Sequence, residues 1–317
     1  MSRIHNASFR RAIATGLVVL SFAGATQAEI IFGLTTDTRL ISFDSATPSA
    51  LLTNVNVSNV AIGDSLVGID FRPSLGPNNG LLYALGVNSA NGSGRMYTLN
   101  TTTGAATFVS TLIADATDAA PPTPFVTVMG RSFGVDFNPV PDRLRVVSDT
   151  GQNLRINVES GAVQLDVPLA YVNSSAIPVV TSVAYSNNFG GATTTTLRGV
   201  DLSQTPDALV TFVSPNDGTL STSVVNLPFD SAIFAGYDIS GLTGTPYFST
   251  SNLSAQNSQL YAAVGGGVTL IGTIGGGASL VGIAAPIGPQ QVPEPGSLAL
   301  FGLSLAGLAL IRRRASR

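Results

Sequence analysis

The sequence of 317 residues contains no cysteine, no lysine and no tryptophan, and its single histidine is His5. Without cysteine, the protein has no disulfide and no thiolate nucleophile. If His5 is removed during export, the remaining chain also lacks an imidazole base and any zinc or iron site of the usual His/Cys type. Charged residues make up only 10%, whereas there are 34 glycines and 18 prolines. This composition is typical of short strands joined by many turns.

Residues 1–28 have the pattern of a secretory signal peptide. Three arginines precede an apolar run at residues 12–23, and Thr26-Gln27-Ala28 supplies the small residues of a cleavage site. We therefore expect signal peptidase to cut between Ala28 and Glu29. The alternative interpretation of the apolar run is a short buried helix.

The C-terminal segment, residues 289–317, contains three parts in a fixed order. They are a Pro-Glu-Pro motif, an apolar run and an arginine cluster, at Pro293, Glu294 and Pro295, at residues 297–311, and at Arg312, Arg313 and Arg314. The apolar run has 15 residues, fewer than the roughly 20 that cross a bilayer core. The arginines favour a cytoplasmic location for the tail.

This order of parts resembles the PEP-CTERM sorting signal of Gram-negative bacteria. The resemblance implies processing by an exosortase near the Pro-Glu-Pro motif, with transient inner-membrane anchoring through the apolar transmembrane helix. It also implies delivery to the cell surface or to the extracellular polysaccharide matrix of a biofilm. A plain C-terminal membrane anchor is the alternative.

The chain between the two signals is acidic. Residues 29–290 keep eight arginines and 17 carboxylates, which gives a net charge of −9. An acidic surface of this kind does not attract the phosphate groups of nucleic acid or of anionic lipid, so we expect no nucleic-acid partner.

A short phrase recurs along the chain, most clearly as GIDFRP at residues 68–73 and GVDFNP at residues 134–139. Weaker copies bring the number of aligned segments to five, at residues 68–71, 134–137, 182–185, 236–239 and 282–285. Their spacings of 66, 48, 54 and 46 residues are near the length of propeller blades. Three further strand-like runs separated by turn residues follow each of the first four copies, so each unit reads as a four-stranded meander.

The fifth copy has no strands after it, because the C-terminal signal begins there. Three strand-like runs stand instead at the other end of the chain, at residues 29–35, 38–44 and 50–55. The sequence therefore predicts an all-β fold over residues 29–288, a five-bladed β-propeller closed by pairing of the N- and C-terminal strands. A β-sandwich or another open β-repeat is the alternative. Residues 113–127 form the longest expected loop, an insertion in the first unit.

Several longer phrases resemble the domain of unknown function 4394 family. They include GLTTDTRLISFD, GRMYTLNTTTGAATFV and FGVDFNPVPDRLRVVSDTGQNLRIN, and the resemblance covers residues 29–285. The family has no established activity. The resemblance therefore implies a propeller-like repeat in an exported protein and transfers no catalytic residue.

Asp70, Asp136 and Asp238 occupy the same position in three of the five copies. Because side chains alternate along a strand, they share a face with the glycine two residues earlier, and the carboxylates could converge at the propeller axis. Three interpretations stay open. The aspartates accept backbone N–H groups in each blade, or they bind a ligand such as Ca²⁺, or they form the acid and base of a glycoside-cleaving site.

The aspartate recurs at the same position of several blades, which favours the structural interpretation. A catalytic pair needs two carboxyls in unlike environments, so that one is protonated while the other is ionised. We therefore expect no catalytic residue and no cofactor, with Ca²⁺ as the exception to test. The expected function is a non-catalytic binding or scaffold propeller at the cell surface, with extracellular polysaccharide as a candidate partner. The alternative is a carbohydrate-active enzyme that uses the three aspartates.

Overall fold

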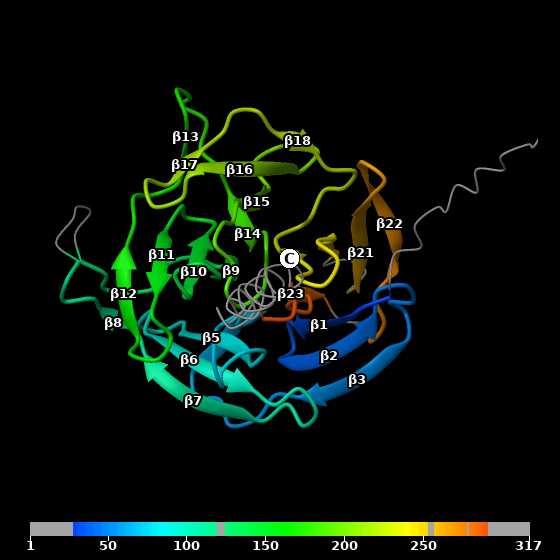
Figure 1. The fold of residues 1–317 in the computed structure, drawn as a ribbon, viewed down its shortest axis with the longest axis horizontal. Coiled ribbons are helices and arrows are strands. Elements are labelled where there is room, and N and C mark those ends of the chain that lie inside the picture. Colours follow the sequence, from blue (N-terminus) through cyan, green and yellow to red (C-terminus); the bar gives the residue numbers. More distant parts are fainter. Residues whose placement is uncertain (1–27, 119–123, 253–256, 278, 291–317) are drawn as a thin grey trace, which may run out of the picture.

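The computed structural model describes residues 28–118, 124–252, 257–277 and 279–290. These residues contain no helix, and their strands form five sheets set around one axis (Figure 1). The prediction of an all-β, five-bladed β-propeller is confirmed. Residues 1–27 and 291–317, which contain both predicted signals except for Ala28, Pro289 and Gln290, lie outside the described residues. Pro293, Glu294, Pro295 and the three arginines are among them.

Blades 1 and 2 begin with the two clearest copies of the repeated phrase, and each continues as an antiparallel meander from the axis outward. Blade 1 contains β4 (Asp64–Phe71), β5 (Leu82–Asn88), β6 (Gly94–Leu99) and β7 (Ala106–Thr111). Blade 2 contains β9 (Phe133–Asn138), β10 (Arg143–Ser148), β11 (Asn153–Ile156) and β12 (Ala162–Leu165), with β8 (Ile113–Ala114) at its outer edge.

Blades 3 and 4 follow the same plan from weaker copies of the phrase. Blade 3 contains β14 (Val180–Tyr185), β15 (Leu197–Asp201), β16 (Ala208–Ser214) and β17 (Thr219–Leu220), to which β13 (Ala170–Tyr171) and β18 (Val225–Asn226) are added. Blade 4 contains β19 (Ala235–Ile239), β20 (Pro246–Asn252), β21 (Asn257–Val264) and β22 (Gly267–Thr273).

Blade 5 closes the ring with strands from both ends of the domain. Its order is β23 (Leu280–Ala284), β1 (Ile30–Thr35), β2 (Arg39–Asp44) and β3 (Leu51–Asn56). The inner strand β23 pairs antiparallel with β1, and Phe32 lies opposite Ala284. The predicted pairing of the two ends is thus confirmed, and it leaves no open edge between the first and last blades.

Two blades differ from the expected four strands. The segment predicted as a loop at residues 113–127 begins with β8, which pairs in parallel with the outermost long strand of blade 2, β12. In blade 3, β13 pairs in parallel with β17 in the same way. Both additions cover a short outer strand whose backbone groups would otherwise be unpaired, so the linkers between blades protect sheet edges.

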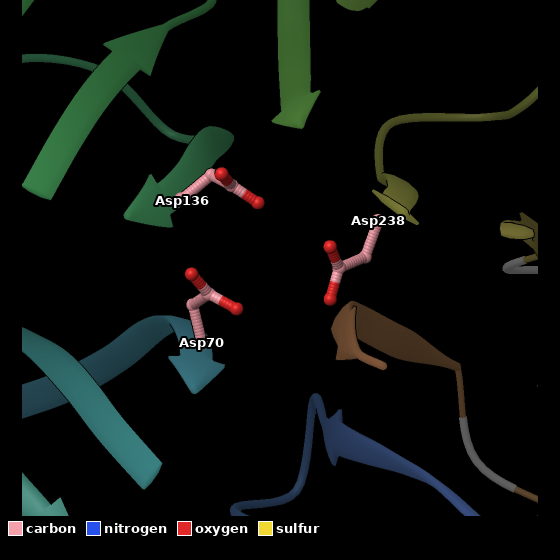
Figure 2. Close-up of side chains that lie close together, drawn as sticks. All are labelled: Asp70, Asp136 and Asp238. Carbon is pink, nitrogen blue, oxygen red and sulfur yellow. The ribbon is translucent and has the colours of Figure 1, made fainter. Parts of the chain in front are cut away.

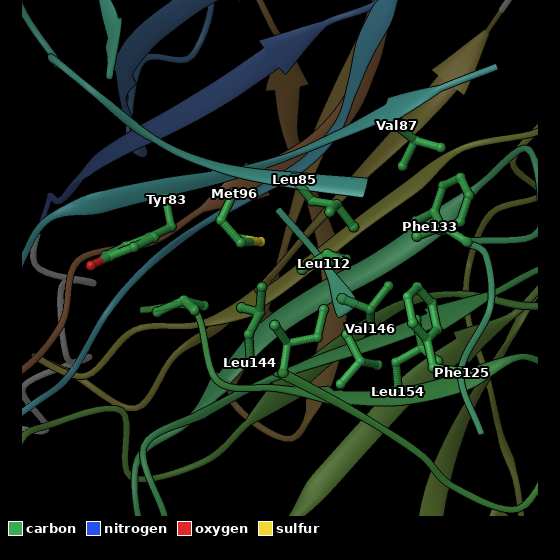
Figure 3. Packing of buried hydrophobic residues seen from close by; sticks show 14 of the residues in the cluster. Tyr83, Leu85, Val87, Met96, Leu112, Phe125, Phe133, Leu144, Val146 and Leu154 are labelled. Carbon is green, nitrogen blue, oxygen red and sulfur yellow. The ribbon is translucent and has the colours of Figure 1, made fainter. Parts of the chain in front are cut away.

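The hydrophobic core consists of clusters between neighbouring blades. Between blades 1 and 2, Leu85 and Met96 of one sheet pack against Leu144, Val146 and Leu154 of the next (Figure 3). These side chains are at most 1% exposed. Burial of each such side chain stabilises the fold by roughly 1.5–3 kcal/mol, so the ring is held without disulfides.

The five inner strands β4, β9, β14, β19 and β23 run in the same direction along the axis, because residues at equivalent positions in all five lie at the same level. We call the face from which they start the entry face and the face at which they end the exit face. Loops that lead into an inner strand belong to the entry face, and the turns that follow an inner strand belong to the exit face.

Candidate functional site

Three carboxylates meet at the propeller axis. Asp70, Asp136 and Asp238 project from β4, β9 and β19, and each is only 1% exposed. One oxygen of each lies within 4.8 Å of the others, and the three carboxyl groups face a common centre (Figure 2). The sequence expectation that these side chains converge is therefore confirmed, and we call them the axis triad.

The glycine two residues before each aspartate allows the neighbouring blade to approach closely. A Cβ on Gly68 would lie 2.4 Å from Cγ2 of Val135, and a Cβ on Gly134 would lie 2.8 Å from the backbone of Ser182. Both distances are shorter than non-bonded carbon contacts allow. The Gly-x-Asp pattern thus brings inner strands close enough for a short carboxylate to reach the next strand.

Each aspartate of the triad accepts a backbone N–H group from the next inner strand around the ring. Phe137 N–H donates to Asp70 Oδ2 at 2.7 Å, and Tyr185 N–H donates to Asp136 Oδ1 at 2.9 Å. Asp238 Oδ2 accepts the corresponding bond of the fifth blade, from Ala285 N–H, at 2.5 Å. In every case the donor immediately follows the residue equivalent to the aspartate, so the triad links the blades in sequence.

Two of the aspartates also accept the N–H group of the residue after them. Phe71 N–H donates to Asp70 Oδ1 at 2.7 Å, and Ile239 N–H donates to Asp238 Oδ1 at 2.6 Å. Asp136 makes no such bond, because the N–H group that follows it is already bound by Asp70. Its buried Oδ2 consequently has no hydrogen-bond partner among the described residues.

Burial dominates the electrostatics of the triad. Burial, followed by the charge of Asp238, raises the pKa of Asp70 well above its usual value. Burial and then the charges of Asp70 and Asp238 raise the pKa of Asp136 in the same direction. Burial also raises the pKa of Asp238 to about 7, although the N–H bond from Ala285 lowers it. The triad therefore resists holding three negative charges by itself.

On the entry side of the triad the axis is nearly filled. The cavity there has a volume of only about 10 Å³ and is lined by the residues that precede the triad position in each inner strand, including Gly68, Gly134, Ser182, Gly236 and Gly282. That volume is near the minimum for a single water molecule. A sugar or peptide substrate cannot reach the carboxylates from this side.

On the exit side a segment that we call the axis strap, residues 286–290, crosses the axis directly after β23. The Pro286 carbonyl accepts a bond from Gly241 N–H, and Gly288 N–H donates to the Asn188 carbonyl, both at 2.8 Å. Gln290 Nε2 donates to the Ser74 carbonyl at 3.0 Å. The strap thus joins blade 5 to the turns after β19, β14 and β4, and it closes the exit end of the axis.

Glu29 adds a fourth buried carboxyl near the axis, at the position where we expect signal peptidase to cut. It is 5% exposed, and its Oε1 accepts a bond from the Ser240 hydroxyl at 2.8 Å. The Glu29 N–H group donates to Ser45 Oγ at 3.0 Å. Ala28 at the predicted cleavage position is exposed, and the cleavage itself stays a prediction.

Sequence reasoning missed a hollow on the entry face of blade 3. It has a volume of about 170 Å³ and is lined by Tyr171, Ser174, Ala176, Gln204, Thr222 and Val224. The Tyr171 hydroxyl is held by a short hydrogen bond to Asp201. No motif indicated this site, because its residues come from three linkers of blade 3 that share no repeated phrase.

Known families identify two parts of the chain. The model of the Domain of unknown function (DUF4394) matches residues 39–284. The chain belongs to the DUF4394 family. The PEP-CTERM protein-sorting motif matches residues 291–314, immediately after the axis strap. This DUF4394 protein is therefore targeted to an exosortase and exported to the cell surface or extracellular space of a Gram-negative bacterium.

Solved structures similar to the DUF4394 chain have low sequence identity to it. TolB from Acinetobacter baumannii has 12% sequence identity and a TM-score of 0.39, over 78% of this chain and 52% of TolB. A putative 6-phosphogluconolactonase from Bacteroides uniformis has 13% identity and a TM-score of 0.40, over 78% of this chain and 82% of the other. The chain spans about half the length of TolB. No curated protein matches it.

The described residues contain no helix long and apolar enough to cross a membrane. The apolar run predicted as a transmembrane helix, residues 297–311, lies outside them.

Proposed function

We propose that the protein is a non-catalytic binding or scaffold domain, displayed at the cell surface or in the extracellular matrix after processing by exosortase. The observation that carries this proposal is the commitment of the axis triad to the backbone. Five of its six carboxylate oxygens accept N–H bonds, from Phe71, Phe137, Tyr185, Ile239 and Ala285. Carboxylates held in this way, with both ends of the axis closed, have no substrate to protonate or attack.

The axis strap supports an orientation for this display. Gln290 is bonded to Ser74 on the exit face, and the sorting motif begins at the next residue. Pro293 is three residues further on, a span of at most about 11 Å even in an extended chain. A protein attached near Pro293 therefore holds its exit face toward the attachment surface, and its entry face points outward.

The hollow of blade 3 opens on that outward face. Tyr171 contributes an aromatic wall, while Ser174, Gln204 and Thr222 contribute hydroxyl and amide groups. No charged side chain lines it, so its chemistry suits a neutral polar ligand such as a sugar unit of the matrix polysaccharide. We place polysaccharide binding at this hollow, away from the axis.

Binding of the purified exported protein to matrix polysaccharide tests the proposal. We expect the wild-type protein to bind, and Gln204→Ala or Thr222→Ala to weaken binding by about tenfold, because each removes a polar contact worth roughly 1.4 kcal/mol. Thr243→Ala is the matched control, since Thr243 is an exposed threonine on the exit face. It should bind as the wild type does.

A reducing-end assay on the same samples addresses the glycoside-cleaving alternative. Release of new reducing ends by the wild type, lost in Asp136→Asn, would establish catalysis and contradict the proposal. Absence of polysaccharide binding by the wild type would refute the binding role, and equal binding by all variants would refute its location in blade 3.

A further inference from the structure

One oxygen of the axis triad has no partner. Asp136 Oδ2 is the sixth oxygen of the triad and lies in a side chain that is 1% exposed. While both carboxyls are ionised no described group donates to it, and it gains a hydrogen bond to Asp238 only when one of the two holds a proton. Figure 2 shows the Asp136 carboxyl directed toward Asp70 and Asp238. A buried carboxylate oxygen without a partner is costly, so either a proton shared with Asp238 or a bound cation must compensate it.

The triad also lacks a balancing positive charge. The ion pairs of the described residues involve Arg39, Arg72, Arg95, Arg145 and Arg155, and none of them reaches the triad. The nearby carboxyl of Glu29 adds repulsion at Asp238. Buried charges in proteins are paired or coordinate metal ions, and no side chain here supplies the pairing.

We propose that the axis triad binds one Ca²⁺ ion at the centre of the ring, held by the carboxylate oxygens of Asp70, Asp136 and Asp238. Ca²⁺ takes six to eight oxygen ligands, and carboxylates bind it through one or both oxygens, so the six oxygens of the triad can fill its coordination sphere. Each carboxylate oxygen has two lone pairs, so an oxygen that accepts an N–H bond keeps one for the ion. The ion ties three blades at a point where their backbones are already linked.

The spacing of the oxygens fits this ion. At Ca–O distances of 2.3–2.6 Å, two oxygens that bind one ion are at most about 4.6–5.2 Å apart. One oxygen of each carboxylate lies within 4.8 Å of the others, so a single Ca²⁺ can contact all three residues. Mg²⁺ retains several waters, and the adjoining cavity of about 10 Å³ has no room for them.

The closed axis determines when the ion enters. The strap covers the exit side and the inner strands fill the entry side, so a folded ring has no path wide enough for a hydrated cation. Ca²⁺ therefore binds as the blades come together during folding. A chelator added to the folded protein removes it slowly.

Refolding separates the two states of the site. The purified exported protein is unfolded in urea and refolded either in EDTA or in CaCl₂, followed by native mass spectrometry and thermal melting. We expect one Ca²⁺ per chain and a melting temperature about 5–10 °C higher after refolding with CaCl₂. Refolding with MgCl₂ should raise it less.

Two variants locate the ion. Asp136→Asn should lose the bound Ca²⁺ and the difference in melting temperature. Asp217→Asn, which changes an exposed carboxylate of blade 3, should keep both. Retention of Ca²⁺ by Asp136→Asn would overturn the assignment to the triad.

The wild-type protein decides the matter even if Asp136→Asn does not refold. Equal melting temperatures in EDTA and CaCl₂, with no bound ion, would overturn the proposal. A proton shared by Asp136 and Asp238 would then compensate the unpaired oxygen in place of a cation.

Discussion

The five equivalent positions of the inner strands divide into two kinds. Three carry Asp70, Asp136 and Asp238, and two carry Ala184 and Ala284. The residue after each of these positions has a backbone N–H group that points to the axis. If the preceding blade has an aspartate, this N–H group donates to that aspartate. If the preceding blade has alanine, the N–H group donates to the aspartate of its own strand.

This difference shows that the axis is not a simple fivefold repeat. Asp136 is the only member of the triad whose preceding blade also has an aspartate, and it is the only member with a free oxygen. Blade symmetry therefore accounts for the backbone bonds of the triad, and the departure from symmetry leaves the unpaired oxygen at which we propose that Ca²⁺ binds. The two roles belong to the same three side chains.

Placing a fourth aspartate at the equivalent inner-strand positions should have the largest effect. Ala184 is fully buried, and Ala184→Asp introduces a further negative charge on the ring beside Asp136. We expect a loss of about 4 kcal/mol or more in the free energy of unfolding, measured by urea denaturation. Ala184→Asn controls for size, because it adds similar volume without charge. An aspartate variant as stable as the asparagine variant would show that charge at the axis is not limiting.

The glycine layer should show a smaller effect that depends on the blade. Gly134→Ala places a methyl group against the backbone of Ser182 and should cost about 2 kcal/mol, because the blades must separate. Gly282→Ala at the equivalent position of blade 5 meets no atom within 4 Å and should change the stability by less than about 0.5 kcal/mol. Equal losses in the two variants would contradict the close approach inferred for blades 2 and 3.

A buried carboxylate outside the triad should make the smallest contribution, visible only as pH dependence. Burial raises the pKa of Asp207 to about 6, and its Oδ2 accepts a bond from Ser231 N–H. Because its pKa is raised on folding, its contribution is complete below about pH 4 and is lost as the pH rises through 6. Asp207→Asn should reduce the fall in stability between pH 4 and 7 by about 1 kcal/mol. Parallel pH curves for both proteins would contradict the raised pKa.

Much of the fold could be predicted from the sequence, because the inner strand of each blade carries a copy of the same short motif. The copies at residues 68–71 and 134–137 carry the alternation and the turn signals that define a meander. The three strand-like runs before Asn56 complete the fifth blade, which predicts closure. The edge strands β8 and β13 could not be predicted, since two residues that pair in parallel with a distant strand have no local pattern.

The candidate site could be predicted in part. Alternation along a strand places Asp70, Asp136 and Asp238 on one face, and the ring brings them together. Which oxygen stays unpaired depends on the order of aspartate and alanine around the ring. The sequence gives this order, but it does not show to which aspartate each backbone N–H group donates. The buried Arg145, which binds Asp166 and three further polar side chains between blades 2 and 3, was also missed. The sequence of β10 does not indicate that a neighbouring blade covers each face of the strand, so an arginine there was not expected to be buried.

The most direct test measures the unfolding free energy of the three asparagine variants side by side, in EDTA. In Asp70→Asn and Asp238→Asn, the new NH₂ group faces a backbone N–H donor, because both oxygens of these residues are acceptors. Each should lose about 3 kcal/mol. In Asp136→Asn the carbonyl keeps the bond from Tyr185, and the NH₂ group replaces the free oxygen, so stability should stay the same or rise. Equal losses in all three variants would contradict the division of the triad on which the account depends.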